Sequence, residues 1–313
     1  MAVKKKRPFP LRGAVQIGFT ALSNGYWQGF AKGRIYQGPL KQLCFPGLNC
    51  YSCPGALGSC PVGALQAVLG RRGTYFSFYV VGFLLMVGAL AGRLVCGFLC
   101  PFGLAQDLLH LIPIPEKWRI RRLPKEHLLQ YLRYGILAVF VVILPLTVVD
   151  IIGQGAPWFC QYICPSGTLM AGIPLVSRDG QLQQLTGGLF AWKIGLMAFL
   201  LILSVFYARP FCRLLCPLGA IYGLANPIAL YRFRVEEDRC THCGACSRAC
   251  PLGLNPAEHP NSPECVRCGK CLRVCPTQAL LPTVQVGKRT QGAQPVAGAA
   301  CAGKCEGCRG CGR

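Results

Sequence analysis

The chain has 313 residues, and its 33 lysines and arginines against 11 aspartates and glutamates give a formal net charge of +22 at pH 7. Hydrophobic residues make up 52% of it and charged residues only 14%, which excludes a disordered protein and argues against an ordinary soluble domain, in which about a quarter of the residues are charged. The 22 cysteines are too many for core packing, and the chain is too long and too apolar to be a small secreted disulfide scaffold.

Four apolar stretches are candidates for membrane-spanning helices, which need about 20 residues. The predicted spans lie near residues 13–31, 74–95, 131–152 and 185–208. The first contains the polar residues Asn24 and Gln28. The fourth is interrupted only by Lys193, whose amine can reach the membrane interface along its aliphatic stem. We therefore predict a membrane domain over residues 1–230.

Two further charge-free stretches, Gln42–Gly70 and Ile151–Ser177, are rich in glycine and proline. Irregular backbone at membrane depth is tolerated only where protein buries it. We therefore predict two re-entrant or interfacial Cys-rich segments at the external face. The predicted fold class is an α-helical polytopic membrane protein with about four transmembrane helices and these two segments. A small α+β two-cluster bacterial-ferredoxin module follows over residues 231–282.

The distribution of lysine and arginine predicts the orientation of the spans. Basic residues crowd the N-terminus, the loop 117–125 and the segment after the fourth span, whereas the loop after the third span has only Arg178. By the positive-inside rule, we predict a multi-pass protein of the prokaryotic inner (plasma) membrane with both termini in the cytoplasm. The loop after the first span does not fit this orientation well, because it also contains lysines and arginines. Membrane lipid explains the net charge better than nucleic acid, because no DNA- or RNA-binding motif is present.

The strongest motif is a run of four cysteines that ends in Cys-Pro and occurs twice in the module, at 240–251 and at 265–276. In two-cluster ferredoxins the fourth cysteine of each run ligates the other [4Fe–4S] cluster. The first cluster would take Cys240, Cys243, Cys246 and Cys275, and the second Cys265, Cys268, Cys271 and Cys250. Zinc is the alternative, but zinc sites rarely carry two such runs with both prolines.

Three Cys-x3-Cys-Pro pairs lie in the predicted membrane domain: Cys96 with Cys100, Cys160 with Cys164, and Cys212 with Cys216. Residues i and i+4 share a helix face, so each pair presents two sulfurs together, and we expect the proline to mark the end of that helix. Cys96, Cys100, Cys212 and Cys216 should meet at the cytoplasmic side and could supply one metal or a further Fe–S cluster with four thiolates. Structural thiols and a redox disulfide are the alternatives.

Two further cysteine groups are candidate ligands. Cys44, Cys50, Cys53 and Cys60 lie within 17 residues of the first external segment and could complete a cluster alone, with Cys160 and Cys164 on the same face. Residues 283–313 form a Gly/Ala/Gln-rich linker and a tail with Cys301, Cys305, Cys308 and Cys311. This tail is consistent with a labile cluster, a zinc site or a disordered thiol tail. Asp107, His110 and Asp150 are candidate proton acceptors at a quinone site, since quinol oxidation releases protons, but a helix cap or a solvated charge is the plainer interpretation.

The segments RLVCGFLCPFG (Arg93–Gly103) and RPFCRLLCPLGAIYGL (Arg209–Leu224), together with the paired ferredoxin runs, resemble the NapH/NosR-type group of membrane-bound 4Fe–4S proteins. The resemblance covers roughly Arg12–Leu281. It implies electron transfer from the quinol pool or a cytoplasmic donor toward an extracytoplasmic redox partner. The segments Asn49–Leu65 and Cys160–Pro174 and the tail depart from the shorter members of that group.

Two classes of function remain open. An electron carrier is favoured over a stand-alone enzyme, with a quinol dehydrogenase subunit as the second candidate within that class. The alternative is an assembly or thiol-redox factor for a partner metalloenzyme, whose Cys-x3-Cys-Pro pairs would cycle between dithiol and disulfide. The second class predicts pairs that hold no stable iron and that react with thiol alkylators.

Overall fold

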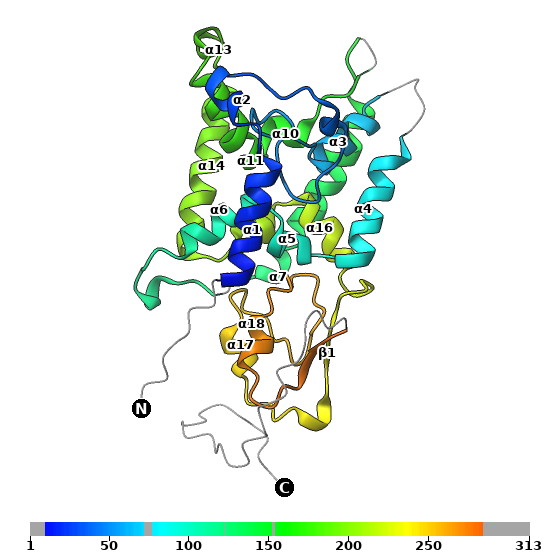
Figure 1. Cartoon of the computed structure of the whole chain (residues 1–313), viewed down its shortest axis with the longest axis vertical. Coiled ribbons are helices and arrows are strands. Elements are labelled where there is room, and N and C mark those ends of the chain that lie inside the picture. Colours follow the sequence, from blue (N-terminus) through cyan, green and yellow to red (C-terminus); the bar gives the residue numbers. More distant parts are fainter. Residues whose placement is uncertain (1–9, 72–76, 122, 152–153, 284–313) are drawn as a thin grey trace.

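The computed structural model describes residues 10–71, 77–121, 123–151 and 154–283. The described chain is mostly helical, with one two-stranded sheet. Figure 1 shows the helices gathered at one end of the long axis, and the segment with β1, α17 and α18 beyond them at the other. We call these parts the helical domain (residues 10–230) and the C-terminal module (residues 231–283).

The first predicted span, 13–31, is two helices rather than one. α1 (Pro10–Ser23) ends before α2 (Trp27–Lys32) begins. Between them, the Asn24 side chain donates to the Thr20 carbonyl at 3.0 Å and to the Ser23 hydroxyl at 3.2 Å. Local side-chain bonds of this kind compete with the helix hydrogen bonds. They explain why α1 ends next to Asn24, a polar residue inside the predicted span.

The other predicted spans coincide with helices of different lengths. α4 (Phe78–Ala91) covers most of the second span. The third consists of α8 (Leu132–Ile136), the π-helix η3 (Leu137–Ile143) and α9 (Leu144–Thr147), which follow one another directly. Within the described residues, α14 (Gly188–Phe206) is the one helix that is long and apolar enough to cross a membrane, so the count of four spans is not confirmed.

Four Cys-Pro steps of the helical domain begin a short helix. In each Cys-x3-Cys-Pro pair the preceding helix ends before the proline, as expected, but the two cysteines do not share that helix. The four helices are α3 (Pro61–Leu69), α6 (Pro101–His110), α11 (Pro165–Gly167) and α16 (Pro217–Ala225). The residue before a proline is pushed out of the helical region, and the cysteine there is extended in all four, whereas proline suits the first helical position. The two cysteines of a pair therefore flank a break, the first lying on α5 (Leu94–Phe98), α10 (Trp158–Tyr162) or α15 (Pro210–Leu214).

The two Gly/Pro-rich segments lie against each other, at the end of the helical domain away from the module (Figure 1). The Gly155 N–H donates to the Gly70 carbonyl at 2.7 Å, and the Phe159 N–H donates to the Gln66 side chain at 3.0 Å. After α11 the chain continues through the π-helix η4 (Thr168–Gly172) and α12 (Ile173–Val176). The remaining helical segments of the domain are η1 (Pro39–Gln42), η2 (Glu116–Trp118), α7 (Glu126–Leu129) and α13 (Gly180–Gln184).

The C-terminal module is small and internally repeated. β1 (Phe233–Val235) pairs antiparallel with β2 (Leu280–Pro282), with Phe233 opposite Pro282. Between the strands lie η5 (Glu237–Arg239), α17 (Ala245–Ala249) and α18 (Lys270–Val274), and the last two pack together. Positive φ angles occur at three positions of the first run and again 25 residues later in the second. The pairs are His242 (48°) and Arg267 (51°), Gly244 (69°) and Gly269 (72°), and Gly253 (66°) and Gln278 (53°). The two cysteine runs therefore have the same backbone path.

Buried ion pairs join the module to the helical domain. Glu264, 5% exposed, pairs with Arg93 at 3.1 Å and with Arg133 at 2.5 Å. Arg213 pairs with Glu126 and donates to the Leu252 carbonyl of the module at 3.0 Å. Leaving one such charge without its partner would cost several kcal/mol, so these pairs hold the two parts in a defined contact.

Candidate metal centres

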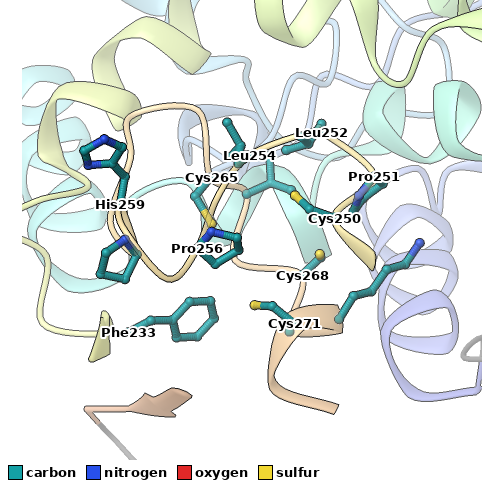
Figure 2. Close-up of a pocket in the computed structure, with 14 residues that line it drawn as sticks. Phe233, Cys250, Pro251, Leu252, Leu254, Pro256, His259, Cys265, Cys268 and Cys271 are labelled. Carbon is teal, nitrogen blue, oxygen red and sulfur yellow. The ribbon is translucent and has the colours of Figure 1, made fainter. Parts of the chain in front are cut away.

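Four cysteines of the module face one pocket. Figure 2 shows the sulfurs of Cys250, Cys265, Cys268 and Cys271 directed toward a common space, closed on one side by Phe233 and on the others by leucine and proline side chains. Three of them come from one run and Cys250 comes from the other. This is the combination of residues that the sequence predicts for the second cluster.

The pocket makes the Cys265 and Cys271 thiols poor acids without a cationic partner. Burial, together with repulsion from the neighbouring thiols, raises the pKa of Cys265 to about 11 and that of Cys271 to about 12. A bound cation removes this penalty, since thiolates are the form that ligates metal. The donor set and its apolar shell therefore fit a thiolate-ligated cluster.

The other four cysteines of the module occupy the equivalent positions of the repeat. Cys240, Cys243 and Cys246 match Cys265, Cys268 and Cys271 in the 25-residue repeat of backbone angles, and Cys275 matches Cys250. Cys246 packs against the small core around Cys271. The pKa of Cys275 lies below its ordinary value, because hydrogen bonds from Thr277 and nearby backbone groups outweigh its partial burial.

A second cysteine group lies in the helical domain next to the module, and we call it the proximal site. Its members are Cys96, Cys100, Cys212 and Cys216, each 5–6% exposed and in electrostatic contact with others of the group. The sequence predicts this meeting of two distant pairs. Gln106 donates to the Cys212 sulfur at 3.1 Å, and backbone N–H groups of Gly103 and Gly219 donate to the sulfurs of Cys100 and Cys216.

Two buried arginines hold the two halves of the proximal site together. Arg93 lies three residues before Cys96 and donates to the Cys212 carbonyl at 2.7 Å. Arg209 lies three residues before Cys212 and donates to the Cys96 carbonyl at 2.6 Å. Each half therefore carries the arginine that binds the other half. Our sequence prediction missed both, although Arg-x2-Cys-x3-Cys-Pro occurs twice and was the available signal.

The remaining cysteines of the helical domain divide into two sets. Cys50 and Cys60 lie with Cys160 and Cys164, and we call these four the distal group. No other cysteine acts electrostatically on Cys44, so it is outside the group. Cys53 lies at its edge: it interacts with Cys50, but its thiol donates to the Asn24 side chain at 3.5 Å. The first external segment thus contributes two cysteines to this group rather than a complete set of four. The tail cysteines Cys301, Cys305, Cys308 and Cys311 lie outside the described residues.

Of the three candidate proton acceptors, Asp107 is held as an ion pair. It pairs with Arg12 and with Arg209, both at 2.5 Å. Burial alone would raise the pKa of Asp107, but the two guanidinium groups outweigh it and hold that pKa below its ordinary value. Burial lowers the pKa of His110, whose ring faces the Ser204 carbonyl at 3.2 Å. Asp150 is exposed, next to the bridge between Val149 and Gly155.

Within the described residues, no group of three or more histidine, cysteine, aspartate or glutamate side chains converges closely enough for a single metal ion. This holds for the pocket around Cys265 as well as for the helical domain. A cluster of several iron and sulfide ions separates its four thiolates more widely than one ion does, since the thiolates bind different irons. The choice between clusters and zinc therefore rests on the cysteine runs in the sequence rather than on sulfur spacing.

Comparison with known families agrees with this donor chemistry. A family model described as a 4Fe-4S binding domain matches residues 74–122, 132–179 and 182–235, which include all three Cys-x3-Cys-Pro pairs. Two further models with the same description match residues 231–252 and 261–281, one on each ferredoxin run. No solved structure matches the chain.

Several curated proteins are similar to this chain over part of their length. The methylamine utilization ferredoxin-type protein MauN of Paracoccus denitrificans is 32% identical over 54% of this chain and 50% of its own, and MauN of Methylorubrum extorquens is 30% identical over 64% and 61%. The ferredoxin-type protein NapH of Haemophilus influenzae is 24% identical over 53% of this chain and 50% of its own. The chain thus spans half to about three fifths of the length of these relatives.

Proposed function

We propose that this chain, which belongs to the NapH/NosR-type family of ferredoxin-type 4Fe–4S proteins, is a membrane-bound electron carrier rather than a stand-alone enzyme. It would connect the quinol pool or a cytoplasmic donor with a redox protein on the extracytoplasmic side. The observation that carries this proposal is the contact between the C-terminal module and the proximal site through buried ion pairs.

Membrane insertion is supported by the surface of the helical domain. Side chains such as Leu85, Phe199 and Ile202 are between 60% and 66% exposed, on the longest apolar helices. Exposing so many large apolar side chains to water would be unfavourable by roughly 1.5–3 kcal/mol each, whereas lipid removes this cost. We infer an inner-membrane protein with several membrane-crossing segments and with the module on the cytoplasmic side, as the basic loops predict.

The proposed ligands of the two ferredoxin clusters are the crossed sets. Cys265, Cys268, Cys271 and Cys250 would hold one [4Fe–4S] cluster, and Cys240, Cys243, Cys246 and Cys275 the other. Such clusters take up and release one electron at a time. The chain's own residues hold the thiolates at fixed positions and exclude water, as Phe233 and Leu252 do at the first pocket.

The proximal site is proposed as the next electron-carrying position. Arg93 contacts the module and the site at once, because its guanidinium pairs with Glu264 and donates to both the Pro263 and Cys212 carbonyls. Gly97 permits a close approach: a Cβ there would lie 2.5 Å from the Val266 carbonyl oxygen of the module. Electron transfer needs short distances held rigidly, and these contacts provide both.

A quinone site is the less supported part of the proposal. Asp107 is a poor proton acceptor, since its two arginine partners stabilise the charged form. His110 remains the better candidate near the proximal site, half-buried and with its pKa below the ordinary value. The identity of the donor therefore rests on the family rather than on a site in this chain.

The proposal is tested by the iron and acid-labile sulfide content of the full chain, purified anaerobically from membranes. We expect about twelve or more iron atoms per chain, with a substantial part retained in a Cys240→Ala/Cys265→Ala variant, because the proximal site holds metal independently of the module. About eight iron atoms, nearly all lost in the variant, together with alkylation of the helical-domain thiols, would instead favour the assembly or thiol-redox factor.

A further inference from the structure

The distal group brings together cysteines from three separate stretches of the chain. Cys60 and Cys164 each precede the proline that begins a helix, Cys160 lies on α10, and Cys50 lies in the loop before α3. The sulfurs interact electrostatically with one another: Cys60 with Cys160 and Cys50, and Cys164 with all three others. A Cβ at Gly167 would lie 3.6 Å from the Cys50 sulfur and 3.8 Å from the Cys164 sulfur, so both sulfurs face the same glycine.

The donors to these sulfurs repeat those of the proximal site. Gln66 donates to the Cys160 sulfur at 3.3 Å, as Gln106 donates to the Cys212 sulfur at 3.1 Å. Both glutamines lie five residues after the proline of a Cys-Pro step. The Gly167 N–H donates to the Cys164 sulfur at 3.4 Å, the same bond that Gly219 makes at the proximal site.

Two cations accompany each group of four thiols. Lys41 and Lys193 interact electrostatically with Cys50, and the Lys193 amine donates to the Cys160 carbonyl at 3.2 Å. Arg93 and Arg209 have these roles at the proximal site. Four thiolates around a doubly positive cluster core carry a net charge of about −2, which nearby cations partly offset. A neutral dithiol pair needs no such cations.

We infer that Cys50, Cys60, Cys160 and Cys164 are the ligands of an additional iron–sulfur cluster at the end of the helical domain away from the module. A single zinc ion is the alternative that the experiment below distinguishes. The place of this cluster in electron transfer rests on the proposed function, but its existence does not. It would be the exit position toward an extracytoplasmic redox protein.

Positions along α14 give an approximate separation of the two sites. Lys193 contacts the distal group, and Ser204, whose carbonyl faces His110 of α6, lies near the proximal site. At 1.5 Å per residue these positions are about 16 Å apart along the helix, roughly half the thickness of a hydrocarbon core. The loop around Leu48 also connects the sites: its N–H donates to the Cys100 sulfur, and its carbonyl accepts from Ser166.

The inference is tested with two variants of the full chain, purified anaerobically. Cys50→Ala/Cys60→Ala/Cys160→Ala/Cys164→Ala removes the distal ligands. Cys44→Ala is the control, since it removes a cysteine of the same segment on which no other cysteine acts electrostatically. We expect the first variant to lose about four iron and about four sulfide ions relative to wild type and the control to lose neither. The zinc content, measured in the same samples, should not change.

Two results would overturn the inference: unchanged iron in the four-cysteine variant, or loss of about one zinc ion in place of iron. Neither depends on the iron of the proximal site, so failure of the proposed function remains distinguishable. If the four-cysteine variant does not fold, the single variant Cys50→Ser tests the inference instead. Cys50 is only half-buried, so we expect this substitution to leave the fold intact. That single change should alter the low-temperature electron paramagnetic resonance spectrum of the reduced protein, and an unchanged spectrum would contradict the assignment.

Discussion

In the C-terminal module, three cysteines of each candidate site come from one short run, whereas in the helical domain each site takes its cysteines from segments far apart in the chain. The module therefore needs only a local backbone path, visible in its repeated positive φ angles, to place its sulfurs. The helical domain needs its whole packing, including arginines that connect the two halves of the proximal site. This difference teaches that spacing in the sequence identifies the first kind of site, and that only the tertiary structure identifies the second.

The largest expected effect tests the crossed ligands of the module. Cys250→Ser and Cys265→Ser should each remove or alter one cluster, about four iron atoms, and the double variant should lose no more than either single one. The reason is that both cysteines line the same pocket. Iron analysis and electron paramagnetic resonance measure it, with Cys246→Ser as the matched comparison. Additive loss in Cys250→Ser/Cys265→Ser would show that the two cysteines belong to different clusters.

The next effect tests the junction between the two regions. Glu264→Gln leaves the buried guanidinium groups of Arg93 and Arg133 without a counter-charge, so we expect a loss of about 3–5 kcal/mol of stability. Thermal unfolding in detergent measures it. The control is Glu236→Gln, which breaks an exposed pair with Arg239 and should change stability by about 0.5 kcal/mol or less. Equal midpoints for the two variants would refute the claim that the pairs hold the module in place.

A third effect concerns pH. Because the folded-state pKa of Asp107 is lower than its unfolded value of about 3.9, its contribution to stability is complete above that value and is lost as pH falls through the folded-state pKa. The difference in unfolding free energy between wild type and Asp107→Asn, about 1.5–3 kcal/mol at neutral pH, should therefore shrink below about pH 4. Unfolding midpoints between pH 3 and pH 7 measure it, and a pH-independent difference would refute the ion-pair role.

The smallest effect compares the proximal and distal sites. Gln106→Leu and Gln66→Leu each remove one N–H donor to a cysteine sulfur, and such bonds favour the more negative, reduced form of a cluster. A bond of about 1 kcal/mol corresponds to about 40 mV for a one-electron couple, so each variant should lower one reduction potential by about that amount. Redox titrations followed by electron paramagnetic resonance would show this as two separate shifts. A shift of the same signal by both variants would mean that the two sites are one.

The elements and the site differ in how far the sequence could predict them. The apolar stretches correctly located α4, α9 and α14. Hydropathy does not register side-chain hydrogen bonds, such as that of Asn24 at the end of α1. The Cys-Pro steps were recognised, and the helix before Pro101 ends as predicted. The shared helix face was wrong, because the restriction that proline imposes on the preceding residue was not applied to Cys100. The meeting of Cys96 and Cys212 was predicted from topology alone. The division of the first segment's four cysteines was not, since it depends on tertiary contacts such as that of the Cys53 thiol with Asn24.

The central claim is that electrons pass between the module and the opposite end of the helical domain through cysteine-held sites. The most direct measurement uses vesicles that contain the full chain, oriented with the module outside, a membrane-impermeant oxidant inside and dithionite added outside. Wild type should reduce the internal oxidant, whereas Cys96→Ala/Cys100→Ala/Cys212→Ala/Cys216→Ala should not, although its module is still reduced. Equal internal reduction by the variant, or none by wild type, would contradict the account.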